Sequence, residues 1–198
     1  PAKVQFAQSY STPNSAVVFA ADNVWMQYMH WNGAQWTKND AGFESFRKVS
    51  DTIAYAMQTN GTLYRYDCEG WTLVTLPAGV TARANSRVFN VTPDEKLLLQ
   101  TQDNSFVVLS RDSSGAYTTD RTVPAIPTDV LGDVWTTDSV ATYAAIRPDS
   151  ITIVDGTISS DGSIYMVVNG SSSSRAYIVR YDKNAWTLLD TADAFDIG

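Results

Sequence analysis

Short apolar segments separated by polar stretches run along the whole chain. The apolar segments are rich in Val, Ile, Tyr, Trp and Thr, and the separating stretches hold Gly, Asn, Asp, Ser and Pro, which is typical of β-strands joined by turns. Five longer segments each predict a strand, a turn and a second strand. They are "AVVFAADNVWMQYMHW", "TIAYAMQTNGTLYRYD", "KLLLQTQDNSFVVLS", "ATYAAIRPDSITIVDG" and "SIYMVVNGSSSSRAYIVRYD".

The turns of these hairpins are predicted at polar residue pairs. An Asn-Gly pair between two apolar runs is the strongest local hairpin signal, because both residues tolerate a positive φ angle. The predicted turns are Asp22-Asn23, Asn60-Gly61, Asp103-Asn104, Pro148-Asp149 and Asn169-Gly170.

One segment also carries helical spacing. Phe43, Phe46, Val49, Ile53 and Met57 follow one another at intervals of three or four residues. The second half of the segment alternates apolar and polar residues and leads directly into an Asn-Gly turn. This favours a strand over residues 52–57, with a short turn or helix over residues 43–46 as the lesser alternative.

An aromatic residue followed by Thr recurs after the second strand of several hairpins. The four pairs are separated by 35, 46 and 69 residues, and the last interval is close to two periods. The segments "TPDEKLLL" at residue 92 and "SSDGSIYM" at residue 159 are a second repeated marker, which predicts the same turn before the same strand. The four pairs are Trp36-Thr37, Trp71-Thr72, Tyr117-Thr118 and Trp186-Thr187.

A repeat of roughly 40 residues in an all-β chain is typical of a β-propeller, in which four-stranded blades cover one another around a ring. The chain length of 198 residues then predicts a single all-β propeller domain over residues 1–198, with about five short blades. The repeated aromatic is expected to fill the wedge between two blades. A β-sandwich with Greek-key connections is the alternative fold.

The segment "FRKVSDTIAYAMQTNGTLYRYDCEGWTLVTLPAG" resembles one repeat of the tectonin family of β-propellers. Members of that family include lectins that bind cell-surface sugars, so the resemblance implies glycan or surface recognition. The residues that carry it are Val49, Ser50, Gly61, Leu63, Tyr64, Arg65, Trp71, Pro77 and Gly79.

The general character of the chain is also similar to that of bacteriophage virion proteins, such as tail, fibre and capsid-decoration proteins. The chain is small, acidic and rich in Ser, Thr and Asn, and it holds one cysteine. This resemblance implies a structural component of a virion, assembled in the cytoplasm and docked to other protein subunits.

The charge balance narrows the range of partners. The formal net charge is −7, whereas nucleic-acid binding needs a basic surface that releases counterions. Attraction to an anionic membrane surface is disfavoured for the same reason. No apolar run is long enough for a transmembrane helix, and the sequence predicts no membrane insertion and no signal peptide.

Residues for catalysis or metal binding are scarce. His30 is the only histidine and Cys68 the only cysteine, so the usual N and S ligands of a zinc site are lacking, and we predict no metal and no cofactor. Acidic residues beside Cys68 oppose thiolate formation. The 21 Asp and Glu residues leave a carboxylate-pair hydrolase as the least favoured alternative, and we predict that the protein is not an enzyme.

Three tryptophans stand outside the repeated aromatic position, at Trp25, Trp31 and Trp135. Aromatic side chains at loop ends stack on sugars or anchor protein partners, so these three are the predicted binding residues, with core packing as the alternative. The sequence therefore predicts a non-enzymatic interaction module of a virion. The alternative function is a lectin-like propeller that binds glycans.

Overall fold

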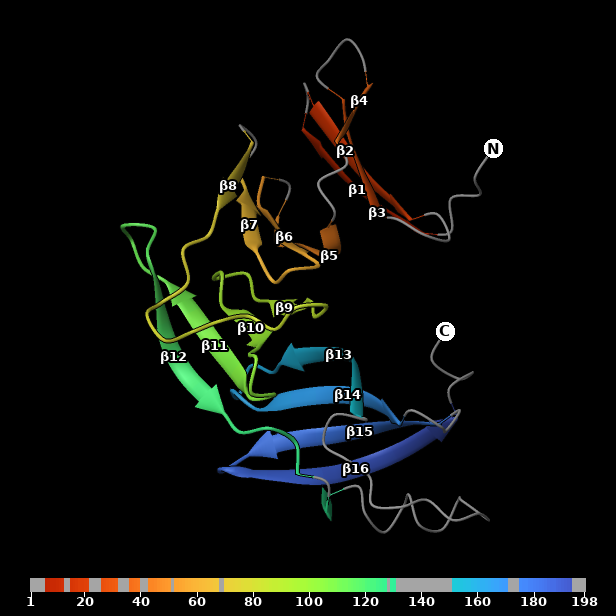
Figure 1. The fold of residues 1–198 in the computed structure, drawn as a ribbon, viewed down its shortest axis with the longest axis vertical. Helices are drawn as coiled ribbons and strands as arrows, with labels where there is room; N and C mark the ends of the chain where they lie inside the picture. The colour runs from red at the N-terminus through yellow and green to blue at the C-terminus, as the bar shows by residue number, and fades with distance from the viewer. Residues whose placement is uncertain are drawn as a thin grey trace. The chain divides into compact units, whose positions relative to one another are not determined.

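The described residues of the computed structural model form sixteen β-strands (Figure 1). Of strands β1–β4 only the backbone pairing is described. The described residues are 6–12, 15–21, 26–31, 36–39, 43–50, 52–67, 70–127, 129–130, 151–170 and 175–193.

The chain forms two compact units, residues 1–122 and residues 123–198, and each is described by itself. The first unit holds three sheets and the second holds one. The prediction of a single domain over residues 1–198 stays a prediction.

The sixteen strands form four sheets of four strands each within the described residues. The first sheet consists of β1 (Phe6–Thr12), β2 (Ser15–Ala21), β3 (Met26–Trp31) and β4 (Trp36–Asn39). The second consists of β5 (Phe43–Lys48), β6 (Ala54–Gln58), β7 (Leu63–Tyr66) and β8 (Trp71–Leu73). The third consists of β9 (Val88–Val91), β10 (Leu97–Gln100), β11 (Phe106–Arg111) and β12 (Tyr117–Val123). The fourth consists of β13 (Ile151–Ile158), β14 (Ile164–Gly170), β15 (Arg175–Asp182) and β16 (Ala185–Asp193).

Each of the four sheets is a meander in which consecutive strands pair side by side. A Greek-key sandwich requires a strand that returns to pair beside the first strand of its group, and the described sheets contain no such crossover. The four-stranded meander is the form of a propeller blade. The prediction of an all-β fold of the propeller type with few blades is confirmed. Residues 131–150, which hold most of the predicted degenerate repeat, lie outside the described part.

One turn geometry recurs at five places between strands. In each turn the first residue's N–H donates to the fifth residue's carbonyl oxygen, and the fourth residue's N–H donates to the first residue's carbonyl oxygen. The fourth residue always has a positive φ, as in three-residue hairpin loops. These fourth residues are Gly61 (86°), Glu95 (59°), Asn104 (68°), Gly115 (90°) and Gly162 (83°).

The turns confirm the sequence markers that fall on described residues. The predicted turns at Asn60-Gly61 and Asp103-Asn104 are both present. The segments at residues 92 and 159 form the same turn and enter strands β10 and β14, as predicted. The predicted turns at residues 22–23 and 148–149 fall outside the described residues.

Two local expectations are wrong. The segment Phe43–Phe46 is neither a turn nor a helix, because it belongs to β5 and pairs with β6. The helical spacing there arises because two successive strands each contribute buried apolar residues, and the combined intervals happen to be three or four residues. Asn169 and Gly170 do not form the turn of their hairpin, because they pair with β13 as the end of β14. The predicted strand over residues 52–57 is confirmed in β6, which covers Ala54–Gln58.

The repeated aromatic–Thr pair begins or nearly begins the fourth strand of every sheet. In the second and fourth sheets it also makes the same contacts. Trp71 packs on Tyr66 at 5.3 Å between ring centroids, and Trp186 packs on Tyr181 at 5.2 Å. The Thr hydroxyl that follows each Trp donates to a carbonyl oxygen of the third strand. The internal repeat seen in the sequence is therefore a structural repeat.

The two faces of the second sheet lie in different apolar clusters. Tyr55 and Met57 face a cluster shared with the third sheet, which includes Leu97, Leu99 and Leu109. Ala54 and Ala56 alternate with them and face the opposite side, where the cluster includes Phe43, Phe46 and Tyr66. A strand that is buried on both faces in this way has the continuous apolar sequence that β6 shows.

The expected place of the repeated aromatic in a wedge between blades is confirmed for Tyr117 and stays a prediction for Trp71. Tyr117 packs against the cluster between the second and third sheets. Trp71 lies on the opposite face of the second sheet and packs on Phe43 at 4.9 Å. Trp71 therefore belongs to the cluster on that face and not to the cluster shared with the third sheet.

Hydrogen bonds between side chains and the backbone also join the second and third sheets. The Val88 N–H donates to Ser45 Oγ at 2.9 Å in a buried position, and Arg47 Nε donates to the carbonyl oxygen of Phe89 at 3.0 Å. These bonds pair polar groups at the sheet interface that would otherwise lose water on burial. They fix the position of the third sheet against the second within the first unit.

Gly61 provides a test of this packing. Its φ is +86°, and a Cβ atom there would lie 2.8 Å from the carbonyl oxygen of Ala82. Gly79 has a φ of +81° and no atom within 4 Å of such a Cβ. We expect Gly79→Ala to lower the free energy of unfolding by about 1 kcal/mol through backbone strain alone. Gly61→Ala should cost at least about 1 kcal/mol more, because a backbone oxygen must move as well.

Urea unfolding of the two variants and the parent protein measures this difference. Equal losses of stability in Gly61→Ala and Gly79→Ala would contradict the described approach of the β8–β9 connection to the Gly61 turn.

Candidate ligand-binding site

A cavity of about 600 Å³ opens between the second and third sheets of the first unit. Strands β7 and β8 and the segment after β8 line one side, and the end of β11 with the turn into β12 lines the other. Both polar and apolar side chains contribute. The lining residues are Arg65, Asp67, Thr72, Leu73, Val74, Thr75, Leu76, Arg111, Ser114, Gly115, Ala116 and Tyr117.

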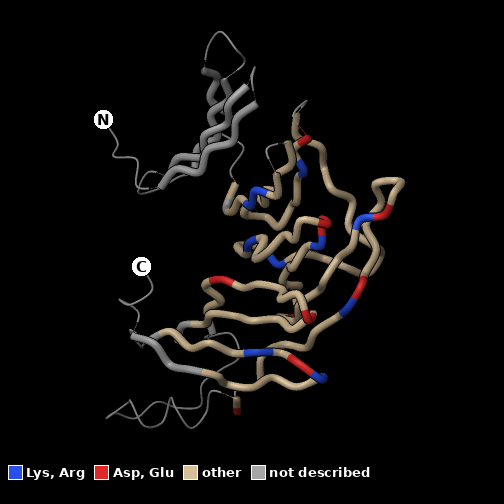
Figure 2. The backbone as a smooth tube through the Cα atoms, turned by 180° about the vertical axis from the view of Figure 1, so that it is seen from behind, with Lys and Arg blue, Asp and Glu red and all other residues tan. Residues whose placement is uncertain are grey.

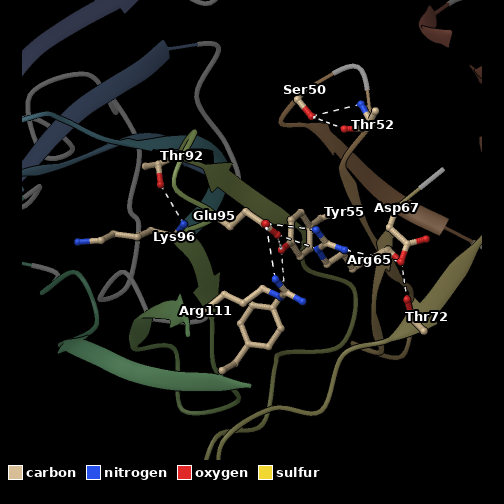
Figure 3. A network of polar contacts seen from close by, with 11 residues as sticks. Ser50, Thr52, Tyr55, Arg65, Asp67, Thr72, Thr92, Glu95, Lys96 and Arg111 are labelled. Atoms are coloured by element: carbon tan, nitrogen blue, oxygen red, sulfur yellow. Dashed lines mark hydrogen bonds and ion pairs between the residues drawn. The ribbon is translucent and has the colours of Figure 1, made fainter. Parts of the chain in front are cut away.

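An ion pair between Arg65 and Glu95 joins the two sheets at the inner end of this cavity (Figure 3). Arg65 Nε donates to Glu95 Oε2 at 2.7 Å and Nη2 donates to Oε1 at 3.2 Å. Two parallel bonds from one guanidinium give a pair with fixed geometry. The side chains are only 13% and 15% exposed, so water screens the pair weakly.

Two tyrosines extend the ion pair toward the cavity. The Tyr55 hydroxyl donates to Glu95 Oε2, and the Tyr55 and Tyr117 hydroxyl oxygens lie 2.6 Å apart. Because the single proton of Tyr55 goes to the carboxylate, Tyr117 donates to Tyr55. The oxygen of Tyr117, which lines the cavity, then has only acceptor capacity left.

Arg111 approaches the same carboxylate from the third sheet. Its Nη1 lies 3.9 Å from Glu95 Oε1, and Figure 3 shows Arg65 and Arg111 reaching Glu95 from different strands. Its Nε atom is buried, and no hydrogen-bond partner for it exists among the described residues. We call Tyr55, Arg65, Glu95, Arg111 and Tyr117 the inter-sheet network.

Glu95 occupies a strained backbone position. It has a φ of 59°, at the place where the four equivalent turns have Gly or Asn. A residue with a Cβ in this region is less stable by about 1–2 kcal/mol, and a long side chain there is uncommon. Such strain persists where the surrounding structure holds the residue, which often marks a functional position. Here the contacts of the carboxylate with Arg65 and Tyr55 hold it.

The network controls the protonation of its members. Burial acts to raise the pKa of Glu95, but hydrogen bonds from Arg65 and Tyr55 and the charges of both arginines outweigh burial and lower it. The hydrogen bond to Glu95 raises the pKa of Arg65. Burial is the main cause that raises the pKa of Tyr55 and of Tyr117. At neutral pH the network therefore holds one carboxylate, two guanidiniums and two neutral phenols.

Among the described residues, the carboxyl groups with a clearly shifted pKa are shifted downward. A general acid needs a carboxyl group with a raised pKa. Several carboxyl groups have a lowered pKa instead. They accept hydrogen bonds from nearby Ser, Thr, Tyr or Arg side chains or from the backbone, which stabilise the ionised form. These groups are Asp94, Glu95, Asp103, Asp112 and Asp161.

The residues named by the sequence as binding candidates are not those of the cavity. Trp25 and Trp135 lie outside the described residues, and Trp31 ends strand β3, where only the backbone is described. Their binding role stays a prediction. Cys68 is also outside the described residues, and His30 lies in β3 with its backbone opposite Thr37.

Charged residues of both signs are mixed along the described chain, and Figure 2 shows basic and acidic residues side by side at several turns. No group of three or more potential metal ligands occurs in the part of the chain that was searched, which is the described part. No helix in that part is long and apolar enough to cross a membrane.

Sequence reasoning missed the two residues that build the site. Arg65 stood within the resemblance to a tectonin repeat, and Glu95 within the repeated turn marker. The only signal for Glu95 was its place in that turn, where a Gly stands in the segment at residue 159. A charged residue at a glycine position could have indicated a special role.

Comparison with known proteins gives distant structural similarities only. No protein-family model matches the chain, and no curated protein matches it. A structure of YCF48 bound to a D1 peptide is similar over 93% of this chain and 51% of that one, with 12% identity and a TM-score of 0.45. The structure of the SapL1 lectin in complex with alpha methyl fucoside is similar over 96% of this chain and 65% of that one, with 13% identity and a TM-score of 0.46. The structure of a mutant of AofleA from Arthrobotrys oligospora is similar over 94% of this chain and 56% of that one, with 11% identity and a TM-score of 0.43.

The chain thus spans about half to two thirds of the length of these structures. At such low identity these similarities give no residue of this chain a role. Nothing in the comparisons supports the resemblance to a tectonin repeat or to bacteriophage virion proteins.

Replacing Glu95 separates its backbone strain from its side-chain contacts. Glu95→Ala and Glu95→Gly both leave Arg65 without its carboxylate, and we expect each to be less stable than the parent by about 2 kcal/mol. Glycine has no penalty at a φ of 59°, so Glu95→Gly should be more stable than Glu95→Ala by about 1 kcal/mol. Chemical unfolding measures both differences. A Glu95→Ala variant as stable as Glu95→Gly would show that the turn is not strained.

Proposed function

We propose that the chain is a non-enzymatic binding module that holds a saccharide-type, hydroxyl-rich ligand in the cavity between the second and third sheets. The observation that carries the proposal is the lining of this cavity, in which fixed donors and acceptors stand beside apolar side chains. Its volume of about 600 Å³ lies within the usual range of small-molecule sites.

The polar lining suits a ligand that both donates and accepts hydrogen bonds. Arg111 offers donors, whereas Asp67 and the Tyr117 oxygen offer acceptors, and the Ser114 oxygen also accepts because its proton goes to Asp112 Oδ1. A sugar hydroxyl both donates and accepts, so neighbouring hydroxyls can satisfy both kinds of group. A ligand with acceptors alone would leave the remaining acceptor capacity of Tyr117 unused.

The apolar lining suits the remaining surface of a sugar ring. Leu73, Val74 and Leu76 contribute side chains to the cavity, and Leu73 is 62% exposed. The C–H groups of a pyranose ring can cover such side chains and remove them from water. An exposed leucine in the lining of a polar cavity is consistent with a surface that a ligand covers.

The site is rigid before a ligand arrives. Arg65 is held by two bonds to Glu95, and Tyr117 is held by Tyr55. Preorganised side chains lose little conformational entropy on binding. The lowered pKa of Glu95 keeps its carboxylate ionised, which supports a holding role and opposes a role as a general acid.

Protein subunits as partners and a place in a virion stay predictions from sequence. No observation in the described residues favours a protein-subunit partner or a virion role over a small ligand bound in the cavity.

A glycan array followed by calorimetry tests the proposal with a matched pair of variants. Thr75 and Thr81 are both exposed threonines in the β8–β9 connection, but only Thr75 lines the cavity. We expect the parent protein to bind at least one glycan class, and Thr75→Trp to weaken that binding about tenfold or more by filling the cavity. Thr81→Trp should bind as the parent does.

Two results would refute the binding site. One is a parent protein that binds no glycan on the array. The other is a Thr75→Trp variant whose affinity equals that of Thr81→Trp.

A further inference from the structure

Arg111 has more hydrogen-bonding capacity than the described protein uses. A guanidinium carries five N–H donors, and the contact described for Arg111 is an ion pair at 3.9 Å with Glu95 Oε1. Its buried Nε has no partner among the described residues. A buried donor without a partner is unfavourable. Because protein encloses this atom, a ligand in the cavity that Arg111 lines meets its terminal nitrogens instead.

The negative charge of Glu95 is already paired with the positive charge of Arg65. Arg65 takes both carboxylate oxygens at 2.7 and 3.2 Å, and the Tyr55 hydroxyl donates to one of them as well. One carboxylate cannot neutralise two guanidiniums. The excess positive charge of this group of three charged side chains therefore lies on Arg111, which lines the cavity.

The other carboxylates near Arg111 are directed elsewhere. Asp112 follows Arg111 in the chain, but its Oδ1 accepts bonds from Ser114 and Ala116 within the turn. Asp67 lies 3.9 Å from Nη1 of Arg65 and is 42% exposed, so water screens it. Within the described residues neither carboxylate pairs with Arg111.

Gly115 brings the Arg111 guanidinium against the cavity wall. The Arg111 Nη2 atom lies 2.7 Å from the place where a Cβ of residue 115 would be. A side chain at residue 115 would require the Arg111 guanidinium to move, and the φ of +90° at Gly115 also favours glycine. The turn therefore holds the guanidinium at the same side of the cavity as Ser114 and Tyr117.

Building on the proposed function, we propose that the ligand of this cavity carries a carboxylate group and that Arg111 binds it. A planar guanidinium matches a carboxylate with two parallel bonds. An acidic sugar, such as a uronic or sialic acid, and the C-terminal carboxylate of a peptide share this chemistry.

Two pairs of probes separate the carboxylate from the rest of the ligand. One pair is D-glucuronate and methyl β-D-glucopyranoside, and the other is N-acetyl-alanine and its amide. Each is titrated into the full chain at constant ionic strength while the amide signals of Gly115 and Ala116 are followed by NMR. We expect at least one acid to bind about tenfold or more tightly than its neutral partner, as a charge-assisted bond requires.

Variants assign the preference to Arg111. Arg111→Ala should remove the preference for the acid, and Arg111→Lys should keep part of it, because lysine keeps the charge but loses the two-bond geometry. Arg83→Ala is the matched control, since it removes the same charge from a half-buried arginine outside the cavity lining. It should keep the full preference.

The outcomes are distinct. A preference for glucuronate supports the inference with an acidic saccharide as the source, and a preference for N-acetyl-alanine alone supports it with a peptide C-terminus as the source. Equal binding of acid and neutral probes, a preference that survives Arg111→Ala, or no binding of any probe would overturn it. If the neutral sugar still binds and Thr75→Trp blocks it, the proposed function stands without this inference.

Discussion

The two-bond ion pair between Arg65 and Glu95 is the interaction on which the candidate site depends. It links strand β7 of the second sheet to the turn before β10 of the third, in addition to the hydrogen bonds that Ser45 and Arg47 make with the third sheet. Its low exposure makes both charges costly unless they stay paired. The pair therefore fixes the cavity walls and leaves Arg111 as the guanidinium that faces a ligand.

The same pair accounts for a local conflict in the chain. A turn that elsewhere uses Gly or Asn at its left-handed position uses Glu95 here. Local preference opposes this residue, and the contacts with Arg65 and Tyr55 outweigh that preference. Conflicts of this kind are expected where a residue serves a site and not the fold. The equivalent turn before β14 has Gly162, which carries no side chain for an ion pair.

Much of the fold could be predicted from the sequence, whereas the site could not. Turn signals such as Asn60-Gly61 and the repeated Trp71-Thr72 pair depend on residues that are neighbours in the chain. The strand order and the repeat could therefore be predicted from the sequence. The helical spacing over Phe43–Phe46 misled, because two strands with buried residues can imitate a helical period. The partners Arg65 and Glu95 are 30 residues apart in the chain, and nothing local indicates that they meet. The aromatic residues Trp25, Trp31 and Trp135 were predicted as binding residues from their residue type and not from any contact between them.

The most direct test of the central claim is an NMR titration of the Glu95 side-chain carboxyl in the folded protein. The network predicts a pKa below the ordinary value for glutamate of about 4.3, with an increase when Arg65 is replaced by Met. Because the folded-state pKa is lowered, the contribution of Glu95 to stability is present above pH 4.3 or so and is lost as the pH falls through the folded-state value. A pKa at or above the ordinary value, unchanged in Arg65→Met, would contradict the account.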